Sequence, residues 1–185
     1  AMLGLTEQSA AVMRTVDKLD KIGAEKVKVL LMEDVGVAEE AADEILKFIA
    51  ITGSNEEVLN ALKGYVGRNE TFDQGYEELC TVAQYLGAFG VPQENFRVDL
   101  TIARGLDYYT GTVYETAMLD HPEIGSICSG GRYDNLAEYY TDKPLPGVGI
   151  SIGVTRLFYV LGEQGMLNPE LPTAPADVLI LPMTE

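Results

Sequence analysis

Cysteine and histidine are scarce in this sequence, and each shortage excludes a class of protein. Its two cysteines, Cys80 and Cys128, lie far apart in unlike contexts. They are too few for a disulfide framework, so we expect two buried thiols in a reduced, cytoplasmic setting. The single histidine, His121, stands beside Pro122 in a polar stretch. It supports neither a multi-histidine metal site nor a Ser-His-Asp hydrolase, so we expect a loop residue and no metal site.

Basic residues are also few, with 13 Lys and Arg against 29 Asp and Glu and a net charge of −16. A surface this acidic repels phosphate backbones, so this segment is a poor main contact surface for nucleic acid, although other parts of a longer protein could hold RNA. No run approaches the ~20 apolar residues of a membrane-spanning helix. The N-terminus lacks the basic start and long apolar core of a signal peptide, and we interpret Ala1 before Met2 as a cloning remnant.

Apolar residues at helical spacing fill the first 94 residues and predict a helical module. We expect helices after Thr6 and over 18–28, 38–51 and 56–62, and a further helix whose apolar stripe runs from Tyr76 to Leu86. Asn55 is the expected N-cap of the 56–62 helix.

After Asn95 apolar and polar residues alternate with period two, which is typical of strands. We expect strands over 96–102, 112–117, 126–129 and 148–152, a short helix over 132–140 and a longer one over 154–161. Because short turns link the strands, we predict an antiparallel sheet with flanking helices and an α+β fold class.

The C-terminal stretch differs again. Pro169, Pro172 and Pro175 mark a linker, and 177–182 has the pattern of a buried strand. We therefore divide the chain into a helical module (1–94), a strand-rich part (95–168), and a linker with the first strand of another domain (169–185). A strand that begins just before the last residue indicates a chain cut inside its next domain.

The first chemically distinctive cluster runs from Arg104 to Gly111, between two expected strands. A guanidinium is a planar, permanently charged fork that binds carboxylate or phosphate oxygens. Tyr108 and Tyr109 offer flat apolar walls with a polar tip. Together these residues predict a site for a small aromatic zwitterion beside a phosphate. A solvent-exposed arginine with two core tyrosines would explain the same residues equally well.

A second cluster begins with Gly130 and Gly131 and continues through Arg132 and Tyr133 to Asp134. Paired glycines let a backbone approach a ligand closely, and Arg132 or Asp134 could then orient it. The alternative is a tight turn that leads into a helix.

A third cluster, from Gly147 to Arg156, joins a glycine-laced strand to a helix. Small residues on the strand leave floor space for a planar ring, and Arg156 near the helix start could reach a phosphate tail. The glycines fall at 147, 149 and 153, which is not the Rossmann spacing, and no Gly-Lys-Ser/Thr follows as in a P-loop.

In this order and spacing, the three clusters resemble the histidyl-tRNA synthetase family of class II synthetases. Residues 104–109 resemble its first histidine signature and 130–134 its second. Residues 149–156 resemble motif 3, with Ser151 where a glycine is usual and Thr155 where an acid is frequent. The helical first part is similar in position to the family's insertion domain. Nothing resembles motif 1 or motif 2, and the anticodon-binding domain would begin near Val178.

The resemblance implies a parent enzyme, a cytoplasmic homodimer, that activates histidine with ATP and Mg²⁺ and transfers it to tRNA(His). It implies Arg104 as the catalytic cation at the α-phosphate and the histidine carboxylate, and Tyr109 as the imidazole contact. The implied histidine-binding set is Arg104, Tyr108, Tyr109, Gly130, Gly131 and Tyr133, and the implied ATP-binding residues are Gly153 and Arg156, the latter at the γ-phosphate. No magnesium ligand is evident, and without motifs 1 and 2 the 185 residues alone are expected to be inactive.

Three alternatives stay open. A regulatory subunit paralogue of ATP phosphoribosyltransferase in histidine biosynthesis would share the fold, but such proteins tend to lose the catalytic arginines, and Arg104 and Arg156 are both kept. A different class II synthetase would account for motif 3 but not for the run from Arg104 to Tyr109. A structural module without a ligand would require the signatures to be accidental.

Overall fold

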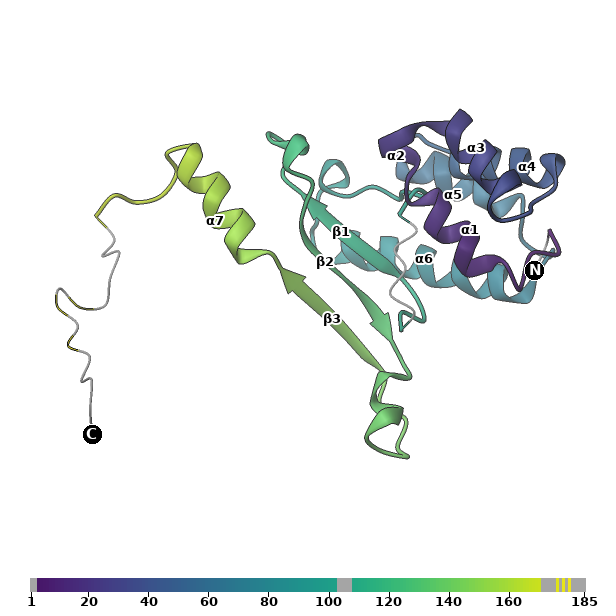
Figure 1. Ribbon diagram of the computed structural model, residues 1–185. Helices are drawn as coiled ribbons and strands as arrows, with labels where there is room; N and C mark the ends of the chain where they lie inside the picture. Colours follow the sequence, from purple (N-terminus) through teal and green to yellow (C-terminus); the bar gives the residue numbers. More distant parts are fainter. Residues whose placement is uncertain (1–2, 103–107, 171–175, 177, 179, 181–185) are drawn as a thin grey trace.

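Helices come first along the chain and a small sheet follows (Figure 1). The computed structural model describes residues 3–102, 108–170, 176, 178 and 180. Within them, six α-helices precede a three-stranded antiparallel sheet, and a seventh helix follows it. The predicted α+β class with an antiparallel sheet is therefore confirmed. No helix of the described part is both long and apolar enough to cross a membrane.

The main core lies among the first four helices, α1 (Ser9–Val16), α2 (Leu19–Ile22), α3 (Ala24–Glu33) and α4 (Glu39–Ile49). Its fully buried centre joins α3 to α4 and consists of Val27, Leu31, Val37 and Ala42. Above it, Lys28 on α3 forms ion pairs with Glu39 at 3.0 Å and Asp43 at 2.7 Å on α4. These partly exposed pairs add little stability, so apolar burial holds the helices together.

The next two helices are α5 (Asn55–Lys63) and α6 (Glu70–Ala88). The predicted N-cap of α5 is wrong by one residue, because Ser54 caps the helix in a capping box with Glu57. That arrangement satisfies two backbone donors that would otherwise lack partners, so the cap does not need Asn55. The Phe48 ring meets the rings of Tyr65 and Phe72 edge-to-face, which connects α4 to the start of α6.

The predicted strand over 96–102 is wrong. Phe96 has an extended backbone, as the alternating pattern indicates, but no strand among the described residues pairs with this segment. Instead, the side-chain amide of Asn55 donates to the Phe96 carbonyl at 3.0 Å and accepts from the Val98 N–H at 2.8 Å. Backbone polar groups need partners, and here a side chain supplies them.

The sheet has the order β1 (Val113–Ala117), β2 (Ser126–Tyr133), β3 (Gly147–Ile152), with α7 (Val154–Glu163) after it. The predicted strands over 112–117 and 148–152 and the helix over 154–161 are confirmed. The strand predicted over 126–129 continues to Tyr133, so the paired glycines lie inside β2 and not in a turn. The predicted helix over 132–140 is wrong, because only a short 3-10 helix forms there (Leu136–Tyr139).

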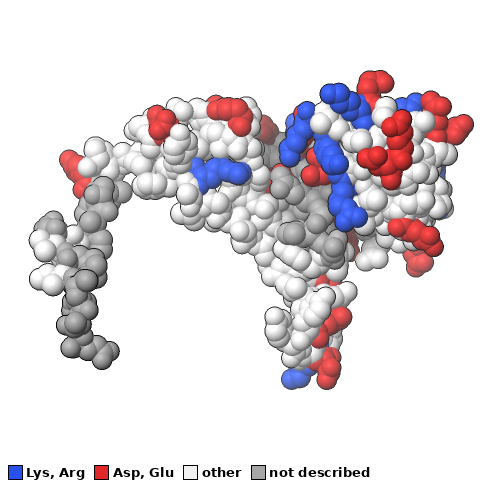
Figure 2. All heavy atoms as spheres, viewed as in Figure 1, with Lys and Arg blue, Asp and Glu red and all other residues white. Residues whose placement is uncertain are grey.

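The burial of apolar side chains differs sharply between the helices and the sheet. Most fully buried apolar side chains belong to the helices, whereas on β3 Val148, Ile150 and Ile152 are 68%, 64% and 54% exposed. Figure 2 shows that the two parts also differ in charge, with charged side chains gathered over the helical part and few over the sheet. The sheet therefore presents apolar side chains, among them Val148, Ile150 and Ile152, that are largely exposed among the described residues.

The cysteine and histidine predictions can be compared with the structure, whereas the C-terminal strand mostly cannot. Cys128 is buried as expected, but Cys80 on α6 is half-buried. His121 lies in a loop before a 3-10 helix (Pro122–Ile124), as predicted. The strand predicted over 177–182 lies mostly outside the described residues, and the boundaries at 94 and 168 stay predictions.

Candidate functional site

The sheet has two faces with different chemistry. Side chains alternate along a strand, and residues paired across antiparallel strands point to the same face. From the register, one face, here called the tyrosine face, carries Val113, Glu115, Ser129, Gly131, Tyr133, Gly147, Gly149 and Ser151. The opposite face, here called the groove face, carries Tyr114, Thr116, Cys128, Gly130, Arg132, Val148, Ile150 and Ile152.

Three tyrosines pack together on the tyrosine face. The Tyr108 and Tyr109 rings lie 4.6 Å apart between centroids, and Tyr108 meets Tyr133 edge-on at 6.1 Å. Tyr109 lies directly over Gly131, because a Cβ built there would be 2.8 Å from Cδ1 of Tyr109 and 2.9 Å from the Thr112 carbonyl oxygen. Only glycine fits at this point of β2, so the second cluster makes room for a ring from the first.

Tyr133 covers the glycines of β3. A Cβ on Gly147 would lie 2.4 Å from Cε2 of Tyr133, and one on Gly149 would lie 2.9 Å from its Cε1. The floor for a planar ring that the glycine spacing predicts therefore exists, and in this structure the chain's own Tyr133 ring lies over it.

The surroundings of Tyr109 favour its protonated hydroxyl. The neighbouring Tyr108 hydroxyl, and then burial, raise the pKa of Tyr109 above its ordinary value. Its hydroxyl can therefore donate a hydrogen bond to a ligand. Tyr108 is 38% exposed and lines a cavity of about 640 Å³ whose other lining residues are Thr110, Asn135, Leu136, Glu138 and Tyr139. The cluster is thus open to solvent on the side where this cavity lies.

Gly130 belongs to the groove face. There the Tyr114 hydroxyl of β1 passes beneath β2 and donates to the Gly149 carbonyl oxygen of β3 at 2.6 Å. A Cβ on Gly130 would lie 2.0 Å from that oxygen and 2.7 Å from the hydroxyl. Burial raises the pKa of Tyr114, which keeps this donor protonated. Gly130 therefore permits a bond that ties all three strands together.

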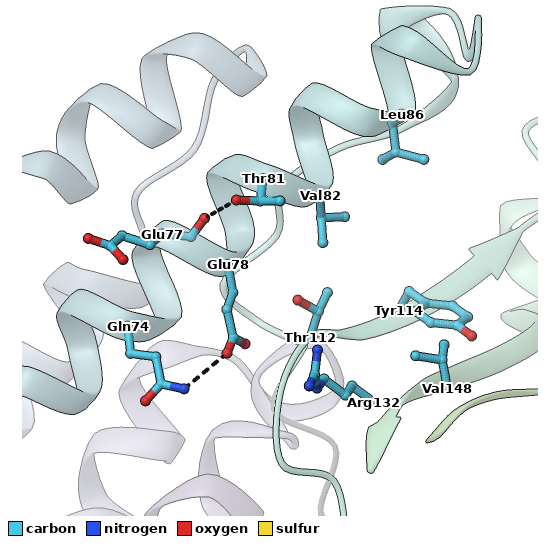
Figure 3. A pocket seen from close by; sticks show the side chains of 10 residues that line it. All are labelled: Gln74, Glu77, Glu78, Thr81, Val82, Leu86, Thr112, Tyr114, Arg132 and Val148. Carbon is cyan, nitrogen blue, oxygen red and sulfur yellow. Dashed lines mark hydrogen bonds between the residues drawn. The ribbon is translucent and has the colours of Figure 1, made fainter. Parts of the chain in front are cut away.

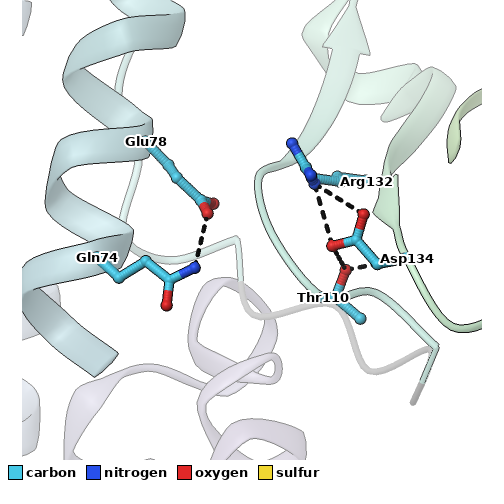
Figure 4. A network of polar contacts seen from close by, with 5 residues as sticks. All are labelled: Gln74, Glu78, Thr110, Arg132 and Asp134. Carbon is cyan, nitrogen blue, oxygen red and sulfur yellow. Dashed lines mark hydrogen bonds and ion pairs between the residues drawn. The ribbon is translucent and has the colours of Figure 1, made fainter. Parts of the chain in front are cut away.

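A polar network fixes the segment after the tyrosines against β2 (Figure 4). The Thr110 hydroxyl donates to Asp134 at 2.8 Å, and Arg132 Nε donates to both carboxylate oxygens of Asp134 at 3.0 and 3.1 Å. The Thr110 N–H also donates to the Arg132 carbonyl at 2.9 Å. These bonds, Arg132 first and then Thr110, lower the pKa of Asp134. Arg132 and Asp134 thus bind each other and Thr110 in this structure.

A groove separates α6 from the groove face (Figure 3). Its volume is about 770 Å³, with Val82 and Leu86 of α6 opposite Tyr114 and Val148 of the sheet. The rest of its lining is Gln74, Glu77, Glu78, Thr81, Thr112 and Arg132. The groove is mostly apolar with an acidic end, and it lies on the side of the sheet away from the tyrosine cluster.

Arg156 and Gly153 lie at the other end of β2. Gly153 precedes α7 and its N–H donates to the Ile127 carbonyl at 2.8 Å. The exposed Arg156 guanidinium donates through one nitrogen to the Ser126 carbonyl. A guanidinium has five N–H donors, so this bond uses a fraction of its capacity.

The structure thus brings together Tyr108, Tyr109, Gly131 and Tyr133, and separately Gly153 and Arg156. Gly130 has its side-chain position on the opposite face, and Arg104 lies outside the described residues. Sequence reasoning missed Thr110 and Tyr114, whose partners lie 24 and 35 residues away. Only the position of Thr110 inside the first cluster pointed toward the site.

Comparison with known proteins identifies the family of the chain. The family described as "Histidyl-tRNA synthetase" matches residues 3–157. The histidine–tRNA ligase of Clostridium tetani is 49% identical over 177 residues, which are 96% of this chain and 40% of that protein. That of Xanthomonas campestris is 51% identical over 166 residues, 87% of this chain and 35% of that protein.

A solved structure of a histidyl-tRNA synthetase also matches this chain. The crystal structure of histidyl-tRNA synthetase from Nostoc sp. PCC 7120 superposes with a TM-score of 0.85 at 44% identity, covering 100% of this chain and 43% of that one. The chain therefore spans well under half the length of the relatives it matches. From its signatures, its fold and these matches, the chain belongs to the histidyl-tRNA synthetase family.

Proposed function

We propose that this chain is the middle part of a histidine–tRNA ligase and holds its amino-acid pocket and one ATP contact. The observation that carries the proposal is the tyrosine cluster at one end of β2 with Arg156 at the other. At about 3.4 Å per residue, the strand from Ser126 to Gly131 is roughly 17 Å long. That length suits an extended ligand with an aromatic ring at one end and a phosphate tail at the other. In this proposal the sheet is part of the class II catalytic sheet, and 1–94 is the insertion module.

The first half-reaction joins histidine to ATP. A carboxylate oxygen of histidine attacks the α-phosphorus in line, a new P–O bond forms, and the bond to the β-phosphate oxygen breaks to release pyrophosphate. Negative charge grows on the α-phosphate oxygens as this happens. A preorganised cation stabilises that charge more in the transition state than in the ground state. We assign this role to Arg104 on its place in the first signature, since it lies outside the described residues.

Recognition of histidine falls to the tyrosine cluster. Tyr109, protonated because its pKa is raised, would donate to an imidazole nitrogen, and Tyr108 and Tyr133 would form the walls. Gly131, and Gly130 through its backbone, would let β2 pass close to the substrate. A pocket that hydrogen-bonds both ring nitrogens rejects apolar analogues by about 10⁴-fold, because its own polar groups would be left unpaired.

ATP would extend toward α7. Arg156 would bind the γ-phosphate through the donors that its bond to Ser126 does not use, with Gly153 allowing close approach at the helix start. Magnesium would accompany ATP, and we assign it no ligand and no step. Transfer of the histidyl group to tRNA(His), a homodimeric parent and a cytoplasmic location belong to the same proposal.

The test is histidine-dependent exchange of pyrophosphate into ATP by the complete ligase chain that contains this sequence. We expect exchange with histidine and none with other amino acids. Arg104→Ala should lower the rate at least about a hundredfold, the typical cost of one transition-state donor. Arg156→Ala should raise KM for ATP more than KM for histidine. The matched control Arg14→Ala, on the exposed surface of α1, should change neither.

The outcomes separate the alternatives. No exchange from folded parent protein would overturn the proposal and favour the regulatory subunit of ATP phosphoribosyltransferase, which a pull-down with that enzyme would test. A near-normal rate for Arg104→Ala would remove the mechanism. The 185 residues alone should show no turnover, so measurable exchange by them would contradict the assignment of essential groups to the rest of the parent.

A further inference from the structure

The side chain of Asn55 connects two parts of the chain that are about 40 residues apart. Its Nδ2 donates to Gln93 Oε1 at 3.1 Å and to the Phe96 carbonyl at 3.0 Å. Its Oδ1 accepts from the Val98 N–H at 2.8 Å. The bonds to Phe96 and Val98 are partly buried, which protects them from competition by water. A primary amide has two donor hydrogens and one carbonyl oxygen, and all three groups are engaged.

These bonds do not serve the helix on which Asn55 lies. Ser54 Oγ accepts from the Glu57 N–H at 3.3 Å, and Glu57 Oε2 accepts from the Ser54 N–H at 2.8 Å, so the capping box is complete without Asn55. The Ser54 N–H, and then its hydroxyl, lower the pKa of Glu57 and keep it charged for that task. The Asn55 side chain can therefore be removed while the cap of α5 stays intact.

The geometry imitates a strand. In a parallel sheet, one residue uses its own N–H and C=O to bond the carbonyl of one residue and the N–H of the residue two positions later on the neighbouring strand. The Asn55 amide does this to Phe96 and Val98, on either side of Arg97. Just beyond, the Asp99 carboxylate accepts from the Thr101 hydroxyl at 2.6 Å and from the Thr101 N–H at 3.0 Å. These two bonds fix the turn that follows. No strand of the described part lies beside this segment, so Asn55 holds it in place of one.

We propose that Asn55 is a positioning residue of the ligase, because it fixes the segment that leads in sequence to the first histidine signature and to Tyr108 and Tyr109. The inference rests on the proposed function. Asn55 is not part of the proposed pocket, and in this proposal it acts by holding 96–98 to α5 ahead of Tyr108 in the sequence. Without the Asn55 hydrogen bonds, the tyrosines would be placed less accurately. Small errors in the position of binding groups lower kcat strongly even where the free energy of unfolding changes little.

The experiment compares Asn55→Ala with Asn60→Ala in the complete ligase. Asn60 is an exposed asparagine on the same helix with no described side-chain hydrogen bond, so it is a matched control. Asn55→Ala should lower kcat for histidine-dependent exchange about tenfold with a smaller change in KM for ATP. Asn55→Asp keeps the acceptor for the Val98 N–H but loses the donor to the Phe96 carbonyl. Its kcat should therefore lie between that of Asn55→Ala and that of the unmodified enzyme.

A second measurement does not depend on activity. Hydrogen–deuterium exchange of the peptide covering 96–102 should be faster in Asn55→Ala than in Asn60→Ala, with helices α1–α4 unchanged in both. Equal exchange and equal kcat in the two variants would overturn the role of Asn55. An enzyme that shows no histidine-dependent exchange before mutation would overturn the proposed function instead, and the deuterium comparison would still decide whether Asn55 orders the segment.

Discussion

Replacing Gly130 by alanine should destabilise the sheet by about 3 kcal/mol. The added Cβ would lie 2.0 Å from the Gly149 carbonyl oxygen, whereas ordinary contact begins at 3.4 Å, so β2 and β3 must separate by about 1.4 Å there. An N–H···O bond lengthened by that amount is broken. The Tyr114 bond to Gly149 would be lost, and from the register we expect about two bonds of the β2–β3 ladder beside Gly130 to be lost with it. At about 1 kcal/mol each, these three bonds sum to the expected loss.

The assay is urea unfolding followed by far-UV circular dichroism, with the m-value checked for a change in the denatured state. The matched control is Gly75→Ala in the middle of α6, where a Cβ meets nothing within 4 Å. It should stabilise the helix by about 0.5–1 kcal/mol, since alanine is the better helix former. The two glycine substitutions are therefore expected to have opposite signs.

A double variant sharpens the test. Adding Tyr114→Phe to Gly130→Ala removes the hydroxyl contact at 2.7 Å but leaves the clash with the backbone oxygen. It should recover little stability, because a backbone atom held by a ladder cannot move as a side chain can. A loss below about 1 kcal/mol in Gly130→Ala would refute the close approach of β2 and β3 at this point.

Three other predictions follow from single contacts. Tyr114→Phe alone should lower the free energy of unfolding in urea by about 1 kcal/mol, and an unchanged free energy of unfolding would contradict the assigned bond to Gly149. The pKa of Asp134 is lowered, so its bonds stabilise the fold above the unfolded pKa of about 3.9 and are lost as pH falls below it. The stability gap between the unmodified chain and Asp134→Asn should therefore narrow in urea titrations from pH 5 to pH 3, and a constant gap would exclude the linkage. Ser54→Ala should cost about 1 kcal/mol in thermal unfolding, whereas Asn60→Ala should cost almost nothing.

Local patterns predicted most of the elements correctly. Most helical stripes over the first 94 residues and the alternation over 112–117 and 148–152 are confirmed, because both periods come directly from backbone geometry. The single helix predicted over 18–28 is wrong, because Gly23, at φ +81°, divides it into α2 and α3. The same reasoning failed over 96–102. Alternation predicts an extended backbone, and Phe96 has one, but the pattern cannot say whether a strand or the amide of Asn55 will bond it.

The sequence also predicted only part of the candidate site. Its residue types were visible in the sequence, since tyrosines, paired glycines and an arginine before an apolar helix stretch are local features. Which glycine faces which ring was not visible. Tyr109 lies over Gly131, but the neighbouring Gly130 makes room for Tyr114 on the opposite face. Arg132 and Asp134, expected to orient a ligand, bind each other and Thr110.

The sequence by itself determined the fold class, the places of most helices and of three strands, and the family signatures. Only the tertiary structure decided that β2 runs through both glycines, that Tyr133 covers the floor of β3, and that Asn55 replaces a strand. The physical reason is the range of the forces involved. Helix and strand periods arise within a few residues of chain, whereas each of these contacts joins groups that are brought together only when the backbone has folded and the sheet register is set.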